Sequence, residues 1–74
     1  MRVTLRLFAS LRTGRFDEAE FELPPAATVG AALDAAGVPR PEAAIIFVNG
    51  RHADFDAHLA EGDALGVFPS IGGG

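Results

Sequence analysis

Two segments near the start of the chain alternate between apolar and polar residues, and a short polar stretch separates them. Residues 1–8 carry an apolar side chain at every second position, and residues 16–23 alternate in the same way. A two-residue period is typical of strands with one face on a core and one in solvent. Because Arg12-Thr13-Gly14-Arg15 lies between them, the segments predict an antiparallel hairpin. The inward side chains are expected to be Val3, Leu5, Leu7, Ala19, Phe21 and Leu23.

Charged residues on the outward face of this hairpin predict its register. If Arg2 opposes Glu22 and Arg6 opposes Glu18, opposite charges meet across the two strands. Each such pair contributes about 0.2–1 kcal/mol. A slip of one residue would turn these charges toward the core, so the pairing is strongly specified.

The next segment has the features of a short helix. Pro24-Pro25 ends the hairpin, Thr28 is a suitable N-cap, and Gly37 supplies a left-handed C-terminal residue before Pro39. The apolar residues between these limits have helical spacing. They are Val29, Ala32, Leu33 and Ala36.

The remaining chain predicts two further strands and a hairpin turn. Residues 44–48 are a continuous apolar run, which predicts a strand buried on both faces. Asn49-Gly50 is a strong two-residue turn sequence. Residues 54–63 are expected to form a loop or a single helical turn, and residues 64–68 alternate as a last strand. Within the loop, Phe55 and Leu59 are expected to anchor to the core.

These elements predict one α+β domain over residues 1–69, followed by a flexible tail over residues 70–74. A single helix covers only one face of a sheet, so a mixed sheet of four to five strands with one covering helix is expected. The order of elements resembles the β-grasp, or ubiquitin-like, fold, in which the first and last strands lie parallel at the centre of the sheet. A chain of 74 residues has little room for a substrate cavity enclosed by its own side chains.

Composition narrows the function further. Without cysteine there is no disulfide, thiolate metal site or cysteine nucleophile. His52 and His58 are interpreted as surface histidines, because no third ligand cluster accompanies them. The net charge of −4, with six arginines and no lysine, argues against nucleic-acid binding. No stretch has the length of a membrane span or the pattern of a leader, so a cytoplasmic protein is expected. A carrier or binding module without a bound cofactor or metal is favoured over an enzyme.

The last residues carry the chemistry. Pro69 cannot donate to a sheet ladder, so Ser70 to Gly74 are expected to project from the domain, with a reach of at most about 17–18 Å. Gly72, Gly73 and Gly74 lack side chains and form a thin thread suited to entering the active site of a partner. The terminal carboxylate, with a typical pKa near ~3.5, is a poor electrophile at neutral pH. A partner must therefore activate it.

Four short sequences in this order resemble the MoaD/ThiS family of sulfur carriers across essentially the whole chain. They are Phe8-Ala9, Val48-Asn49-Gly50, Leu59-x-Glu61-Gly62-Asp63 and the terminal Gly73-Gly74. Phe68-Pro69-Ser70-Ile71 resembles MoaD, the small subunit of molybdopterin synthase, more than ThiS.

The resemblance implies a carrier chemistry supplied by partners. A ubiquitin-activating-type adenylyltransferase, similar to MoeB or ThiF, would use ATP to adenylate Gly74, and a sulfur donor would convert it to a thiocarboxylate. The thiocarboxylate would deliver sulfur inside a MoaE-like large subunit of molybdopterin synthase. An apolar docking patch is implied at Phe8, Phe68, Pro69 and Ile71, and the hairpin register adds Phe16 opposite Phe8.

Three residues depart from the family pattern and leave the partner open. His52 replaces a common apolar contact, Ser70 a second proline, and Gly72 an alanine. The alternatives are a carrier for thiamine or another sulfur metabolite, a ubiquitin-like protein modifier, and an interaction domain whose tail has no chemistry.

Overall fold

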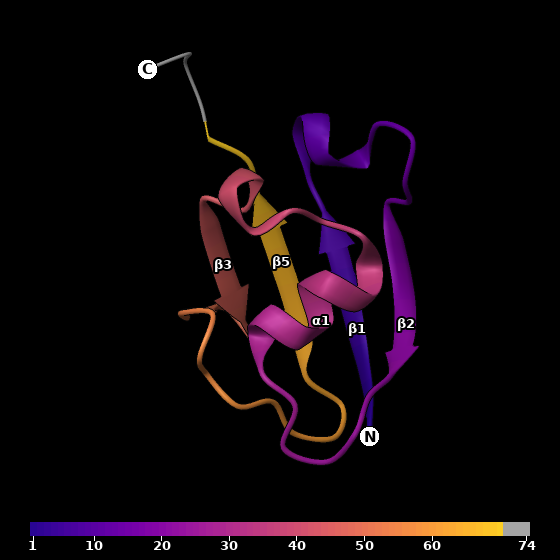
Figure 1. The fold of residues 1–74 in the computed structure, drawn as a ribbon, viewed down its shortest axis with the longest axis vertical. Coiled ribbons are helices and arrows are strands. Elements are labelled where there is room, and N and C mark those ends of the chain that lie inside the picture. The colour runs from indigo at the N-terminus through magenta and orange to yellow at the C-terminus, as the bar shows by residue number, and fades with distance from the viewer. Residues whose placement is uncertain (71–74) are drawn as a thin grey trace.

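The structure is a computed structural model that describes residues 1–70. Figure 1 shows a twisted sheet with one α-helix across it. In chain order the elements are β1 (Arg2–Leu7), the 3₁₀ helix η1 (Ala9–Arg12), β2 (Glu18–Glu22), α1 (Val29–Ala36), the 3₁₀ helix η2 (Arg40–Glu42), β3 (Ile45–Val48), β4 (Arg51–His52) and β5 (Ala64–Phe68).

The strands form one mixed sheet in the order β2-β1-β5-β3-β4. β1 and β5 are parallel, and every other pair is antiparallel. Figure 1 shows β1 and β5 side by side, pointing the same way. This is the predicted β-grasp arrangement, and the expected α+β class is confirmed.

The β1–β2 hairpin has the register that the charges predict. Arg2 faces Glu22 and Arg6 faces Glu18. The Arg2 Nε–Glu22 Oε1 distance is 3.2 Å, and the Arg6 Nε–Glu18 Oε1 distance is 3.4 Å. Because all four side chains are exposed, each pair adds only about 0–1 kcal/mol, and their main effect is on register.

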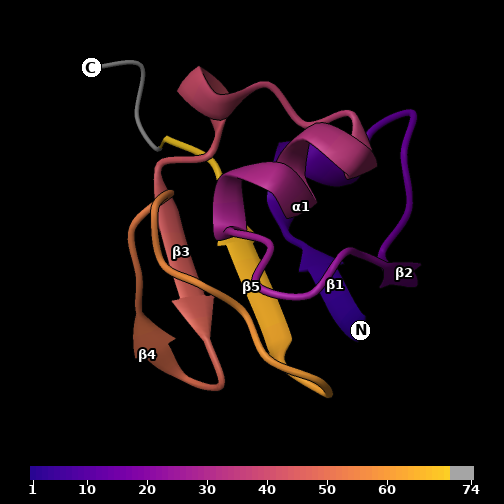
Figure 2. The same ribbon diagram turned by 60° about the horizontal axis from the view of Figure 1, so that its bottom comes forward.

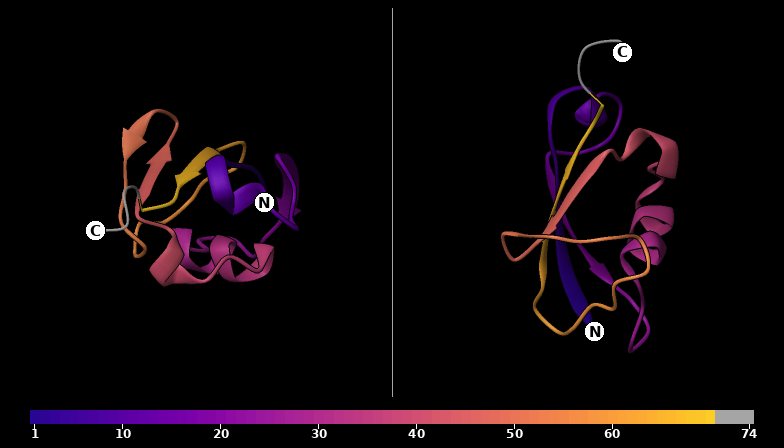
Figure 3. Two further views of the ribbon diagram at one scale, coloured as in Figure 1. Left: turned by 90° about the horizontal axis from the view of Figure 1, so that it is seen from above. Right: turned by 90° about the vertical axis from the view of Figure 1, so that its left-hand side faces the viewer.

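A single layer covers one face of the sheet and encloses the core. The right-hand view of Figure 3 shows the sheet edge-on with α1 on one side. Alternate residues of β1 and β5 point toward α1, as the sequence period predicts. The buried apolar residues are Val3, Leu5, Leu7, Leu11, Leu23, Val29, Ala32, Leu33, Val38, Ala43, Ile46, Leu59, Leu65 and Val67.

Helix α1 begins and ends at the predicted residues. The backbone N–H of Ala31 donates to Thr28 Oγ1 at 3.2 Å, and Gly37 closes the helix with a φ of 72°. The loop after β4 also satisfies the first turn, since Val29 N–H donates to Ala57 O and Gly30 N–H to Phe55 O. The N-terminus of α1 is thus held by both its cap and a distant loop.

Replacing Thr28 with Ala is expected to lower the free energy of unfolding by about 1 kcal/mol, because the Ala31 N–H loses its acceptor. For a domain of this size, the midpoint of thermal unfolding should fall by about 4–8 °C. Thr28→Ser keeps the hydroxyl and serves as the control. If serine and alanine cost the same, the cap contributes nothing.

Strand β3 departs from the prediction of burial on both faces. Ile46 points into the core, but Ile45 is 39% exposed and Phe47 is half-buried on the uncovered face. α1 is on the other face, and β4 offers only two residues beside β3. The apolar run therefore places hydrophobic side chains on a face that the described residues leave open.

The Asn49-Gly50 turn is confirmed, and it does more than reverse the chain. Asn49 and Gly50 have φ values of 52° and 82°, as a two-residue hairpin requires. Asn49 Nδ2 also donates to Asp63 Oδ1 at 2.9 Å, while Asn49 Oδ1 accepts from Ala64 N–H at 2.9 Å. Figure 2 shows the loop that joins β4 to β5. The Asn49 side chain fixes the end of that loop to the β3–β4 turn.

Candidate functional site

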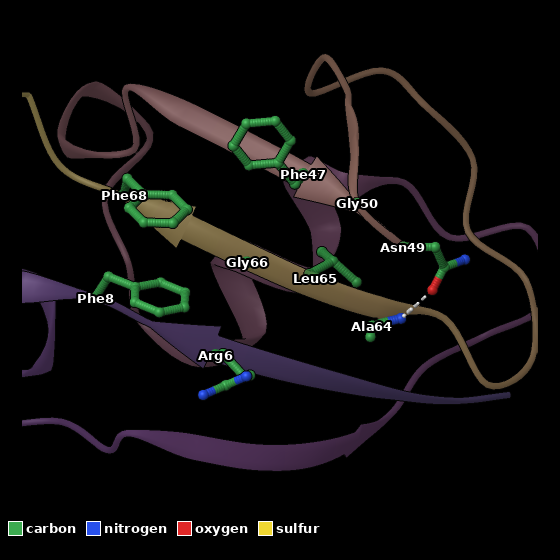
Figure 4. A pocket seen from close by; sticks show the side chains of 9 residues that line it. All are labelled: Arg6, Phe8, Phe47, Asn49, Gly50, Ala64, Leu65, Gly66 and Phe68. Carbon is green, nitrogen blue, oxygen red and sulfur yellow. Dashed lines mark hydrogen bonds between the residues drawn. The ribbon is translucent and has the colours of Figure 1, made fainter.

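Three phenylalanines from different strands gather on the uncovered face of the sheet. The rings of Phe8 and Phe68 are stacked, with centroids 4.2 Å apart and planes 5° apart. The Phe47 ring meets the Phe68 ring edge-on, with centroids 5.9 Å apart and an angle of 89° between the ring planes. Figure 4 shows the three side chains, which we call the aromatic cluster. All three are half-buried, so they present ring surface to solvent without a covering layer from residues 1–70.

Pairing of β1 with β5 brings two members of this cluster together. Leu7 is in register with Val67 in the core, and the N–H of Phe8 donates to Val67 O at 3.1 Å. The next residue on each chain, Phe8 and Phe68, must then point to the open face. The predicted placement of these two rings is confirmed. Phe47 was not predicted, because a run expected to be buried on both faces gave no reason to single it out.

The predicted addition of Phe16 to this face is wrong. Phe16 packs against the core and meets Phe21 at a centroid distance of 5.6 Å. The hairpin ladder ends at Arg6 and Glu18, and η1 begins just beyond, at Ala9. The two chains have separated before Phe16 could lie opposite Phe8, so the register does not extend to it.

A shallow groove of about 430 Å³ runs along β5 beside the aromatic cluster. Its floor is formed by the small residues Gly66 and Ala64, while Phe47 and Arg6 stand on either side (Figure 4). We call it the β5 groove. It is lined by Arg6, Phe8, Phe47, Asn49, Gly50, Ala64, Leu65, Gly66 and Phe68.

Charge divides the open face into two halves. On the β1–β2 side, Arg6 pairs with Glu18 and its Cζ lies 5.5 Å from the centre of the Phe8 ring. On the β3–β5 side, the surface is aromatic and aliphatic, and His52 meets Phe47 edge-on at 5.9 Å. His52 therefore stands at the margin of the aromatic cluster. An apolar area bordered by charge is typical of a protein-binding surface.

The chain leaves the sheet beside the aromatic cluster. Ala44 N–H donates to Phe68 O at 3.0 Å, Pro69 follows without an N–H, and Ser70 is exposed. Pro69 is half-buried and lines a separate hollow of about 330 Å³ between η1 and η2, rather than the β5 groove. Ile71, Gly72, Gly73 and Gly74 lie outside the described residues, so their predicted roles stay predictions.

Another hollow, lined by residues of η2, β3 and the loop after β4, is bordered by a structural ion pair. Arg40 pairs with Asp34, with Nη2 3.0 Å from Oδ2, and lies 5.7 Å from the ring centre of Phe55. The hydrogen bond to Asp34 raises the pKa of Arg40. A Cβ on Gly30 would fall 2.6 Å from Arg40 Cζ, so this glycine lets the guanidinium lie flat on the helix. Within residues 1–70, no three His, Cys, Asp or Glu side chains are grouped to hold a metal.

Comparison with known proteins gives the family. A family model described as Mut7-C ubiquitin matches residues 2–72. The chain belongs to the Mut7-C ubiquitin family. No curated protein sequence matches it.

Solved structures place this Mut7-C ubiquitin chain among small ubiquitin-like proteins. Small archaeal modifier protein 1 from Haloferax volcanii is 26% identical, with a TM-score of 0.80 and 100% of both chains covered. Molybdopterin converting factor subunit 1 from Pyrococcus furiosus is 30% identical, with a TM-score of 0.75, covering 96% of this chain and 99% of that one. Another Haloferax volcanii protein is 31% identical, with a TM-score of 0.77, and the match covers 100% of this chain and 87% of that one. The predicted resemblance to MoaD-type ubiquitin-like proteins is confirmed.

In residues 1–70 no helix is long and apolar enough to cross a bilayer.

Proposed function

We propose that this Mut7-C ubiquitin protein is a sulfur carrier whose reactive group is the carboxylate of Gly74, and that it supplies sulfur for molybdopterin synthesis. The main support for the proposal is the place where the chain leaves the sheet. β5 ends beside an uncovered aromatic cluster, Ser70 is exposed, and the sequence beyond ends in three glycines. The similarity to molybdopterin converting factor subunit 1 over nearly the whole chain supports the choice of pathway.

The chemistry takes two steps on a partner enzyme. A carboxylate oxygen of Gly74 attacks the α-phosphorus of ATP, and pyrophosphate leaves, giving an acyl adenylate. A sulfur donor of the sulfide class then attacks the carbonyl carbon, and AMP leaves, giving a thiocarboxylate. Glycine suits the second step, since no side chain blocks the approach of the sulfur donor to the carbonyl carbon. In this proposal the partner enzyme supplies the catalysis of both steps.

Two partners follow from this chemistry. An adenylyltransferase of the MoeB/ThiF type activates Gly74, and a large subunit of the MoaE type receives the sulfur. Residues 70–74 reach at most about 17–18 Å, so either partner must lie against the end of the domain that carries Phe8 and Phe68. We propose the aromatic cluster as the docking surface for both. Because the first step consumes ATP, the cytoplasm is the proposed location.

Mass spectrometry tests the proposal directly. The protein is incubated with the adenylyltransferase of its own organism, ATP and sulfide, and the intact mass is measured. A gain equal to the mass of sulfur minus that of oxygen is expected, and it should disappear without ATP. Unchanged mass in the complete reaction contradicts carrier chemistry. Isopeptide-linked adducts on lysines of other proteins would instead assign the chain to the modifiers, as the small archaeal modifier protein is named.

A further inference from the structure

Gly66 lies in the middle of the central strand, where the backbone conformation does not require a glycine. Its φ is outside the positive range that favours glycine, unlike those of Gly37 and Gly50. A Cβ there would lie 3.4 Å from Phe8 Cε2 and 3.9 Å from Phe68 Cε1, which is van der Waals contact. A strand glycine costs backbone entropy and packing, and such a residue often marks a close approach by another molecule.

The space over Gly66 is the floor of the β5 groove. Across the strands, Gly66 is in register with Phe47 on β3 and with Arg6 on β1. Along β5, Phe68 closes one end of the groove, and Asn49 lies at the other end beside the small Ala64 (Figure 4). The groove is therefore lined by Phe47 on one side, Arg6 on the other and Phe68 at one end, and no side chain larger than a methyl group forms its floor.

We propose that the β5 groove receives one aliphatic or aromatic side chain from the adenylating partner, and that Gly66 is a specificity-determining residue of that interface. The inference rests on the proposed function. The groove is open along its length, whereas sites for small molecules bury most of the ligand surface. A side chain projecting from a protein surface fits this shape, because the partner's own surface covers the open side.

The length of the tail places the adenylating partner over this end of the sheet. Ile71 to Gly74 span at most about 13–14 Å when fully extended from Ser70. The enzyme that binds ATP and the Gly74 carboxylate is therefore held close to the end of β5. Phe68 is two residues before Ser70, and Gly66 is two residues before Phe68 on the same face. A protein surface that reaches Gly74 is placed to cover the groove.

Gly66→Val tests the inference by filling the floor of the groove. β-branched residues are favoured in strands, so the domain is expected to fold, with the Phe8 ring moving aside because a Cβ at this position already lies 3.4 Å from Phe8 Cε2. The KM of the protein in ATP–pyrophosphate exchange by the adenylyltransferase should rise about 10-fold to 100-fold, the equivalent of one buried apolar side chain, with little change in kcat. Thr4→Val is the matched control: it adds a valine to the same face of neighbouring β1, outside the groove lining, and its KM should stay at the wild-type value.

Gly66→Ala is a second test of the inference in case the valine variant does not fold. Its Cβ meets its neighbours at ordinary distances, so it should fold and raise KM by a few-fold. A folded Gly66→Val or Gly66→Ala variant with wild-type KM overturns the inference while leaving the proposed function intact. If the wild-type protein gives no exchange, the proposed function fails and the inference with it. If sedimentation shows a wild-type dimer that Gly66→Val dissociates, the groove belongs to a second copy, which also overturns the inference.

Discussion

Replacing Phe68 with Asp is expected to weaken binding to the adenylyltransferase by about 100-fold or more while the domain stays folded. Phe68 stacks on Phe8 and meets Phe47, so it is the centre of the aromatic cluster. Burying a phenylalanine at an interface is worth about 1.5–3 kcal/mol, and an unpaired carboxylate in its place adds a desolvation cost. Residues in this position are typical binding hot spots.

The fold should survive this change because the Phe68 side chain is on the uncovered face. Its backbone oxygen keeps the bond from Ala44 N–H, and the loss within the domain is the aromatic contact, about 0.5–1.5 kcal/mol per pair. Titration calorimetry measures the affinity, and circular dichroism measures the midpoint of thermal unfolding.

Two control variants separate docking from folding. Phe16→Asp changes a half-buried phenylalanine that packs on the core, so it should lower thermal stability. Ala35→Asp adds the same charge at an exposed position on α1, away from the open face, so it should bind normally. Unfolding of Phe68→Asp, or wild-type affinity of the folded variant, would refute the docking role.

Local sequence patterns were sufficient to predict the structure wherever the type of one residue decides a local conformation. The facing charges of Arg2 with Glu22 and Arg6 with Glu18 gave the hairpin register. Thr28 and Gly37 gave the limits of α1, because a hydroxyl acceptor and a left-handed residue are what helix ends need. Asn49-Gly50 gave the turn for the same reason.

Long-range contacts were not predictable in the same way. The apolar run at residues 44–48 indicates hydrophobic surroundings, but it cannot distinguish a covering helix from a surface left open. Phe16 shows a second limit, since alternation alone does not say where a ladder ends. The hydrogen bonds of the Asn49 side chain to Asp63 and Ala64 join residues about fifteen positions apart.

The candidate site was predicted in its chemistry more than in its shape. Phe8 and Phe68 follow from strand alternation, which a single sequence shows. Phe47 and the β5 groove require knowing that β3 and β1 flank β5, a fact of topology. Gly66 could have been noticed as a glycine inside a strand pattern, and that was the available clue.

Deleting Gly74 is expected to reduce thiocarboxylate formation by about 100-fold or more without changing the stability of the domain. The shortened chain still ends in Gly72-Gly73, so the terminal residue keeps its chemistry and loses only reach. One residue spans about 3.3–3.6 Å, and a misplacement of 1 Å at a reacting centre can cost about 100-fold in rate. Intact-mass spectrometry of a timed reaction with ATP and sulfide measures the product.

Variants of matched length show whether reach or residue type is responsible. Adding a glycine after Gly74 keeps a glycine end and lengthens the thread, while Gly74→Ala keeps the length and places one methyl group beside the carbonyl. If distance is limiting, deletion should be far more damaging than either of these changes. Thermal unfolding should be the same in all three variants, since the tail follows the last hydrogen-bonded strand. Full activity of the deletion variant would show that the reactive carboxylate is not placed by the length of the chain beyond Phe68.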